Sequence, residues 1–122
     1  MIVGDQADTL EMLGASFQSR GYETLLCHSA EEALEIAGRE HFDILISDIA
    51  MPARDGLQLI RDLRLRKDLE TVPAIALTGY AAQNDVDNAI AAGFNLHLTK
   101  PIEPDELSAA VEKLLNSFQN RK

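Results

Sequence analysis

The sequence predicts an α/β fold in which a parallel sheet is covered by helices on both faces. Short apolar runs alternate with segments of helical periodicity along the 122 residues, and this alternation is typical of strands joined by helical crossovers. The run at residues 42–48 is almost continuously apolar, as expected for a central strand buried on both faces. Right-handed crossovers then favour five strands in the order 2-1-3-4-5, a doubly wound, flavodoxin-like (βα)5 sheet formed as one domain by residues 1–122.

Each expected strand is a short apolar run that ends at a turn residue or a polar side chain. The strands are expected at residues 1–3, 22–27, 42–48, 74–77 and 96–98. A segment with apolar residues at helical spacing follows each strand. These stripes are Leu10, Leu13 and Phe17; Ala30, Ala33, Leu34 and Ala37; Leu59, Ile60 and Leu63; Val86, Ala89 and Ile90; and Leu107, Ala110, Val111, Leu114 and Phe118.

Local sequence signals mark the starts of three expected helices. Ser29 and Glu32 have the spacing of a capping box in front of the second helix. We expect Asp8 to cap the first helix rather than to bind a metal. Pro104 opens the last helix, which is expected to leave residues 119–122 as a short tail.

Acidic residues dominate the composition, with 20 Asp and Glu against 11 Lys and Arg and a formal net charge of −9. This charge repels the nucleic-acid backbone, so we expect no nucleic-acid binding by the domain. Five of the basic residues lie on or beside the third helix, where a solvated helix face is expected in preference to a docking patch. They are Arg54, Arg61, Arg64, Arg66 and Lys67.

One cysteine and three scattered histidines provide neither an internal disulfide nor a zinc module. Cys27 is expected to be a small buried apolar residue. No apolar run approaches the roughly 20 residues that cross a bilayer, and the N-terminus lacks the profile of a signal peptide. We therefore expect a cytoplasmic domain without membrane contact.

Charged and hydroxyl side chains stand at the ends of four expected strands, and they are Asp5, Asp48, Thr78 and Lys100. The carboxyl ends of parallel strands meet at one edge of a sheet, so these side chains are expected to converge. Two carboxylates that lie close together repel unless a cation lies between them, and Mg²⁺ prefers such oxygen ligands. The convergence predicts a magnesium site at which Asp48 forms an aspartyl phosphate, with Lys100 and Thr78 stabilising the phosphoryl oxygens.

The same residues lie in segments that resemble the receiver domains of two-component response regulators. The segments are Asp5, Ile44-Leu45-Ile46-Ser47-Asp48-Ile49-Ala50-Met51-Pro52 through Asp55-Gly56, Leu77-Thr78 and Thr99-Lys100-Pro101. The resemblance spans essentially the whole chain. It implies a cis peptide bond before Pro101. It also implies these roles: Asp48 as phosphoacceptor, Asp5, Asp48 and the Ala50 carbonyl as Mg²⁺ ligands, and Thr78 and Lys100 as phosphoryl contacts.

The resemblance further implies a phosphorelay switch rather than a turnover enzyme. Asp48 would accept a phosphoryl group from a histidine kinase or a histidine phosphotransfer protein and lose it slowly by itself. Thr78 and His97 would carry the conformational switch. The residues expected to contact the donor are Gln6, Thr9, Met12, Ala15, Pro101 and Ile102.

The resemblance leaves open the oligomeric state of the domain and whether the domain is part of a larger protein. A homodimer through the fourth helix, the fifth strand and the fifth helix is left open. The segments at residues 77–80 and 92–101 resemble receivers found in hybrid sensor histidine kinases. A stand-alone regulator is the other arrangement considered.

The sequence departs from the family pattern at two site positions. Gly4 stands where the family has the first of two consecutive acids, which predicts weaker Mg²⁺ binding without loss of the phosphoacceptor. His97 stands where the switch residue is usually Tyr or Phe, and its titration near neutral pH predicts pH-sensitive switching. By the same resemblance, Ala50 and Tyr80 are expected to tune water access to the phosphoryl group.

Three other functions are compatible with this fold class. The residues argue against two of them and leave the third as the alternative. A hydrolase of the haloacid-dehalogenase type needs an acid two residues after its nucleophile, where this chain has Ala50. A nucleotide- or flavin-binding domain needs a first loop that accepts phosphate, whereas residues 4–8 present carboxylates. An atypical receiver that docks proteins without phosphorylation remains the alternative, because Gly4 removes one acid from the metal site.

Overall fold

The computed structural model describes residues 1–79 and 83–119 and contains the expected parallel sheet. Its five strands lie in the order β2-β1-β3-β4-β5, and each neighbouring pair is parallel. The predicted fold class and strand order are therefore confirmed. The strands are β1 (Ile2–Val3), β2 (Leu26–Cys27), β3 (Leu45–Asp48), β4 (Ala74–Thr78) and β5 (Leu96–Thr99).

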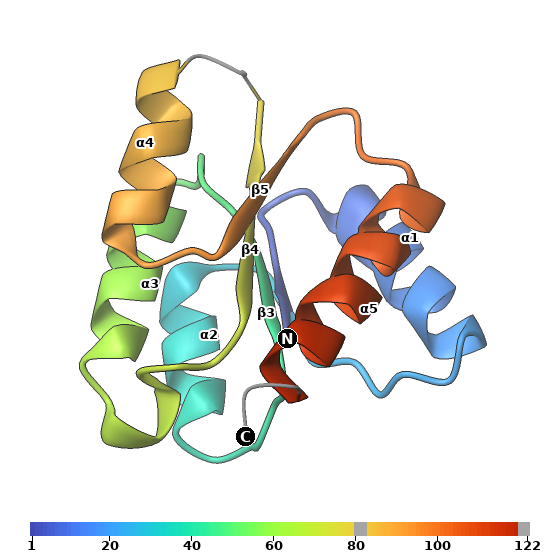
Figure 1. The fold of residues 1–122 in the computed structure, drawn as a ribbon, viewed down its shortest axis with the longest axis horizontal. Coiled ribbons are helices and arrows are strands. Elements are labelled where there is room, and N and C mark those ends of the chain that lie inside the picture. The colour runs from blue at the N-terminus through green and yellow to red at the C-terminus, as the bar shows by residue number, and fades with distance from the viewer. Residues whose placement is uncertain (80–82, 120–122) are drawn as a thin grey trace.

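Helices cover both faces of this sheet (Figure 1). Helices α2, α3 and α4 lie on one face, and α1 and α5 lie on the other. The helices are α1 (Ala7–Ser19), α2 (Ala30–Ala37), α3 (Gly56–Arg64), the short 3₁₀ helix η1 (Lys67–Leu69), α4 (Gln83–Ala92) and α5 (Pro104–Gln119). Of the helices in the described part of the chain, none is both long enough and apolar enough to cross a bilayer.

The central strands bury alternate side chains in two separate hydrophobic clusters. Ile46 and Ile75 belong to the cluster packed by α1 and α5, whereas Leu45 and Ala74 belong to the cluster packed by α2, α3 and α4. This alternation follows from the two-residue period of a strand. Burial on both faces explains why nearly every position of the central run must be apolar until the strand reaches its polar end.

Two strands are shorter than the sequence predicts. β2 contains only the last two residues of the expected strand at 22–27, and β3 begins at Leu45 rather than at Phe42. Both strands pair with β1, which offers only Ile2 and Val3 to each of them. The length of β1 therefore limits β2, whereas β3 begins where its pairing with β4 begins, at Leu45 opposite Ala74.

The first two helix starts differ in detail from the predictions. The Ser29 hydroxyl accepts a hydrogen bond from the Glu32 N–H at 3.1 Å, as in a capping box. The Glu32 carboxylate, however, accepts from the N–H of His28 rather than from that of Ser29. Asp8 lies inside the first turn of α1, whose N-cap is Gln6, so the prediction of an Asp8 cap is wrong.

The last two helices each require one correction. α5 begins at Pro104 as predicted, but it includes Gln119, so residue 119 is not part of a tail. In α4, Ala89 is buried whereas Ile90 is 48% exposed. The apolar stripe of α4 is therefore narrower than predicted.

Arg64, the last residue of α3, and Arg66, two residues beyond it, donate hydrogen bonds to neighbouring segments instead of forming a solvated face. Arg64 Nη2 donates to the Gly93 carbonyl at 2.7 Å, and Nη1 donates to the Leu69 carbonyl at 3.0 Å. Arg66 donates to the Leu34 carbonyl in the last turn of α2 at 3.1 Å. Cations stabilise the unpaired carbonyls at helix ends. The expectation of a solvated face is therefore wrong for these two residues.

Candidate functional site

The four predicted strand-end residues lie at one edge of the sheet, at the top of Figure 1. Asp5 follows β1 and Lys100 follows β5. Asp48 and Thr78 are the last residues of β3 and β4. Since β1, β3, β4 and β5 are neighbours in this order, the parallel sheet brings the four residues together from distant parts of the chain.

Asp48 is a buried carboxylate with a close counter-charge. It is only 5% exposed, and Lys100 Nζ lies 2.6 Å from its Oδ1. Apart from the Lys100 ammonium, no N–H or hydroxyl in the described part of the chain donates to this buried oxygen. Burial raises the pKa of the Asp48 carboxyl above its ordinary value, because desolvation outweighs the Lys100 ammonium, and the Asp5 carboxylate adds to the rise. Further positive charge would stabilise this site.

The segment after Asp48 is fixed by the start of α3. The Gly56 N–H donates to the Ile49 carbonyl at 2.8 Å, and a Cβ at residue 56 would lie 2.2 Å from the Asp48 carbonyl oxygen. Asp55 caps α3 in a full capping box with Gln58. The Asp55-Gly56 pair thus sets how closely α3 approaches β3, a role that the resemblance did not supply.

Gly4 lies directly beside the Asp48 side chain. A Cβ at residue 4 would be 2.7 Å from Asp48 Oδ2. The sequence indicated only that a carboxylate is missing at this position. The contact itself could not be read from the sequence, because spacing along the chain does not give the direction of the Asp48 side chain.

The two predicted switch residues lie on the β4 and β5 strands, which pair with each other. The hydroxyl of Thr78 donates to the Leu98 carbonyl at 3.5 Å, a long hydrogen bond. His97 lies opposite Ala76 in the sheet and is half-buried. The Lys100–Pro101 peptide bond is cis, as the resemblance implied. Tyr80, predicted to affect water access, lies outside the described residues.

The predicted magnesium ligands provide a small donor set. Asp5 is exposed beside the buried Asp48, and the two carboxylates interact electrostatically. Ala50, expected to contribute its carbonyl, is exposed two residues beyond β3. Within residues 1–79 and 83–119, no group of three His, Cys, Asp or Glu side chains could hold a metal. Two carboxylates, one of them buried beside an ammonium that does not fully offset its desolvation, nevertheless fit a hard divalent cation that retains water ligands.

Most of the predicted donor-contact residues line one shallow groove beside Lys100. The groove has a volume of about 270 Å³ and runs between α1 and the β5–α5 connection. Met12 is 47% exposed. Ala15 is also exposed on α1 but does not line the groove. The predicted residues found in it are Gln6, Thr9, Met12, Pro101 and Ile102.

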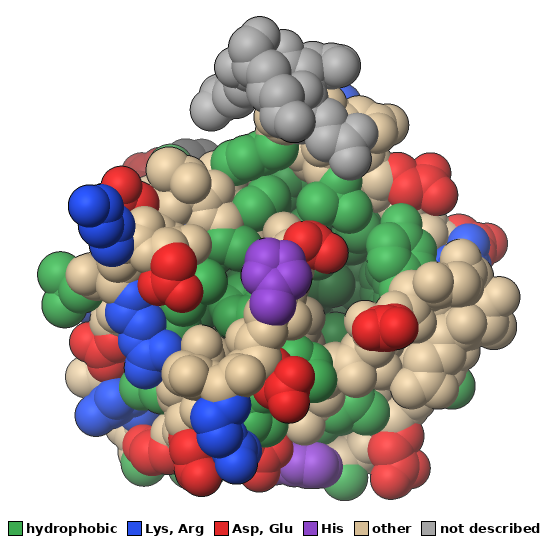
Figure 2. All heavy atoms as spheres, turned by 90° about the horizontal axis from the view of Figure 1, so that it is seen from below, with side chains coloured by type: hydrophobic (Ala, Val, Ile, Leu, Met, Phe, Trp, Pro, Cys, Tyr) green, Lys and Arg blue, Asp and Glu red, His purple; other side chains and the backbone are tan. Residues whose placement is uncertain are grey.

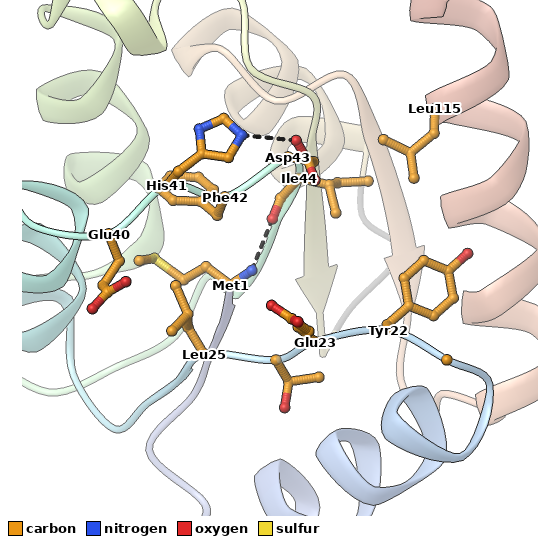
Figure 3. Close-up of a pocket in the computed structure, with 12 residues that line it drawn as sticks. Met1, Tyr22, Glu23, Leu25, Glu40, His41, Phe42, Asp43, Ile44 and Leu115 are labelled. Atoms are coloured by element: carbon orange, nitrogen blue, oxygen red, sulfur yellow. Dashed lines mark hydrogen bonds and ion pairs between the residues drawn. The ribbon is translucent and has the colours of Figure 1, made fainter.

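A larger hollow of about 540 Å³ lies at the opposite, amino-terminal edge of the sheet. Figure 2 shows this face, where hydrophobic side chains gather in a hollow bordered by charged ones. In Figure 3 the His41 ring points to Asp43, with Nε2 2.9 Å from Oδ1, and the Met1 amine donates to the Ile44 carbonyl. Asp48 and Lys100 do not line this hollow, so its size does not make it the site of the strand-end chemistry.

Comparison with known proteins agrees with this fold. A model of the response regulator receiver domain family matches residues 1–112, and the chain therefore belongs to this family. It is 40% identical over 118 residues to an uncharacterized 14.6 kDa protein of Leptolyngbya boryana, covering 97% of this chain and 90% of that protein. It is 33% identical over 115 residues to the transcriptional activator protein PfeR of Pseudomonas aeruginosa, covering 94% of this chain but 37% of PfeR.

A solved structure gives the same result in three dimensions. The receiver domain of the sensor histidine kinase PA1611 from Pseudomonas aeruginosa has a TM-score of 0.86 to this chain at 30% identity, and the match covers 94% of each chain. That structure has a magnesium ion coordinated in its active-site cleft. Receiver domains are the part of two-component systems that histidine kinases or phosphotransfer proteins phosphorylate.

Proposed function

We propose that this chain is a phosphoacceptor domain that takes a phosphoryl group from a phosphohistidine onto Asp48. The observation that carries the proposal is the buried ion pair between Asp48 and Lys100 at the strand-end edge. The pKa of Asp48 is raised by burial, and perturbed carboxyl groups beside an ammonium are typical of reactive sites. Asp5 provides the second carboxylate that a divalent cation needs.

The proposed reaction is an in-line phosphoryl transfer. A carboxylate oxygen of Asp48 forms a bond to phosphorus while the bond between phosphorus and the donor imidazole nitrogen breaks. The nitrogen keeps the electron pair of that bond and takes a proton from solvent. The Lys100 ammonium and the Thr78 hydroxyl would stabilise the phosphoryl oxygens. Bound Mg²⁺, held by Asp5, Asp48 and the Ala50 carbonyl, would add positive charge at the same oxygens.

The phosphoryl group is proposed to be lost slowly and without a second enzyme. A rapid hydrolase would need an acid near the nucleophile to activate water. The residue two positions after Asp48 is Ala50, which has no such group. The domain therefore stores the phosphoryl group as a signal rather than turning over a substrate.

Phosphorylation is proposed to act through the hydrogen bond of Thr78. Its present acceptor is the Leu98 carbonyl at the long distance of 3.5 Å. A phosphoryl oxygen on Asp48 would be a charged and stronger acceptor. Rotation of Thr78 toward it would free space beside the half-buried His97 on β5 and bias the face formed by α4, β5 and α5. This face is the proposed surface for a homodimer or a downstream target.

The proposed donor is a histidine kinase or a histidine phosphotransfer protein that docks on the groove beside Lys100. The exposed Met12 and the groove residue Ile102 provide a small apolar contact next to the phosphoacceptor. The likeness to the PA1611 receiver supports a place in a cytoplasmic hybrid sensor kinase.

One observation favours a second candidate function, a receiver that docks partners without being phosphorylated. Gly4 leaves the metal site with one carboxylate fewer than the family pattern has. If Mg²⁺ and the phosphoryl group cannot bind, the groove could still bind a partner protein.

Amide NMR with Mg²⁺ and beryllium fluoride, a phosphoryl mimic, separates these two functions. The proposed function predicts shifts around Asp48, Thr78, His97 and Lys100 that are absent in Asp48→Asn. An unchanged spectrum at saturating Mg²⁺ would contradict phosphoacceptor function and favour docking without phosphorylation.

A further inference from the structure

We propose that Gly4 is a positioning residue, whose missing side chain lets the Asp48 carboxylate lie inward against β1. The observation is steric. A Cβ at residue 4 would lie 2.7 Å from Asp48 Oδ2 and 3.6 Å from Asp48 Cγ, and the first distance is shorter than a non-bonded contact allows. The present Asp48 position and any side chain at residue 4 therefore exclude each other.

Gly4 itself has little freedom to move away. It is buried, and its N–H donates to the Cys27 carbonyl of β2 at 3.0 Å. The preceding Val3 pairs with strands on both sides, facing Cys27 and Ser47. A side chain at residue 4 would therefore displace the Asp48 carboxylate rather than the backbone of β1.

The surroundings of Asp48 indicate the side toward which its carboxylate would be displaced. On the other side of β3, Asp48 is paired in register with the buried Leu77 of β4. The start of α3 at Gly56 packs against the Asp48 main chain. The remaining open side is the strand-end edge, where Asp5 is exposed. A Cβ at residue 4 is thus expected to push Asp48 toward the proposed ligands of Mg²⁺.

Gly4 has two effects that can be separated, the absence of a carboxylate and the absence of a Cβ. The inference rests on the proposed function only for the position of the metal. If the missing carboxylate alone matters, Gly4→Asp tightens Mg²⁺ binding and Gly4→Ala does nothing. If the missing Cβ also matters, Gly4→Ala tightens Mg²⁺ binding although it adds no charge. Gly38→Ala is the matched control, because the nearest atom to a Cβ there is a backbone oxygen at 3.4 Å, an ordinary contact.

The first test follows the ¹³C shift of the Asp48 side-chain carboxyl in metal-free protein and then titrates Mg²⁺. We expect Gly4→Ala to change this shift and to lower the Kd for Mg²⁺ by about threefold or more, while Gly38→Ala changes neither. A wild-type carboxyl shift in Gly4→Ala would overturn the inference. Because that shift is measured without metal, it tests the position of Asp48 even if the domain binds no phosphoryl mimic.

A double-mutant cycle with Asp48→Ala covers the case in which Gly4→Ala is unstable. Asp48→Ala removes the carboxylate that a Cβ at residue 4 would meet. Gly4→Ala is therefore expected to lower the free energy of unfolding in the wild-type background and to have little effect in the Asp48→Ala background. Equal destabilisation in both backgrounds would overturn the inference, because the conflict would then lie with the backbone.

Discussion

Gly56 lies against the main chain of Asp48, so close that a Cβ at residue 56 would be 2.2 Å from the Asp48 carbonyl oxygen and 2.9 Å from Ile49 Cα. Its N–H also donates to the Ile49 carbonyl at 2.8 Å. The first residue of α3 is therefore in direct contact with the segment that ends β3. This contact fixes the backbone from which the side chain of Asp48, the proposed phosphoacceptor, projects.

Gly56→Ala is expected to destabilise the domain by about 1–3 kcal/mol, because the added methyl meets backbone rather than a movable side chain. It is also expected to reduce phosphorylation of the fraction that remains folded. Urea unfolding, with Gly38→Ala as the control, measures the first effect. Wild-type stability of Gly56→Ala would show that α3 is not held at this distance from β3.

Asp48→Asn is expected to stabilise the domain near neutral pH by about 1 kcal/mol, since an amide is less costly to bury than a carboxylate. Lys100→Met should have the opposite effect, by about 1–3 kcal/mol, because it leaves the buried carboxylate without its counter-charge. Thermal or urea unfolding in the absence of Mg²⁺ compares the three proteins. A less stable Asp48→Asn protein would contradict the conclusion that desolvation outweighs the ion pair.

The raised pKa of Asp48 makes the difference in stability between Asp48→Asn and the wild type depend on pH. As the pH falls, the folded protein takes up the Asp48 proton before the unfolded chain does, so the stability of the wild type increases relative to Asp48→Asn. The gain from Asp48→Asn should thus be greatest near neutral pH and shrink toward acid pH. Unfolding curves at several pH values test this, and a gain that grows as the pH falls would contradict it.

Arg64→Ala is expected to lower the free energy of unfolding by about 1.5–3 kcal/mol, because two carbonyls lose a charged donor. Arg64 donates to the carbonyls of Leu69 and Gly93, linking α3 to η1 and to the α4–β5 connection. Arg61, which is exposed on the same helix, provides the control substitution Arg61→Ala. Equal stability of the two variants would show that the hydrogen bonds of Arg64 add nothing.

Met12→Gln should separate donor docking from phosphoryl chemistry. We expect transfer from a phosphorylated histidine phosphotransfer domain to slow about tenfold, equivalent to ~1.4 kcal/mol, while phosphorylation by acetyl phosphate is unchanged. Leu65→Gln removes another exposed apolar side chain, which is 85% exposed at the end of α3, and should affect neither rate. Equal rates for the two variants with the protein donor would place docking elsewhere.

Much of the fold followed from the sequence because its signals are local. Alternating apolar runs and helical stripes give the order of strands and helices, and the buried run that ends at Asp48 marks the central strand. The ends of β2 and β3 were not predictable in this way. They depend on which residues β1 and β4 offer for pairing, and a strand's own apolar residues do not encode its neighbour's length.

The sequence predicts which residues meet at the strand-end edge, but it does not predict how their side chains pack against their neighbours. Asp5, Asp48, Thr78 and Lys100 follow from strand ends, since a parallel sheet gathers them at one edge. The contact of Gly4 with Asp48 depends on a side-chain direction that residue spacing does not contain. The hydrogen bonds of Arg64 likewise join segments distant in sequence, whereas charge patterning indicates only which face of a helix is polar.

The most direct test of phosphorylation at Asp48 is the intact mass of the domain after incubation with acetyl phosphate and Mg²⁺. We expect that the wild type gains the mass of one phosphoryl group, that Asp48→Asn gains none, and that the added mass disappears slowly once the donor is removed. A wild type that gains no mass, or an Asp48→Asn protein that gains the same mass, would contradict the assignment of Asp48 as the phosphoacceptor.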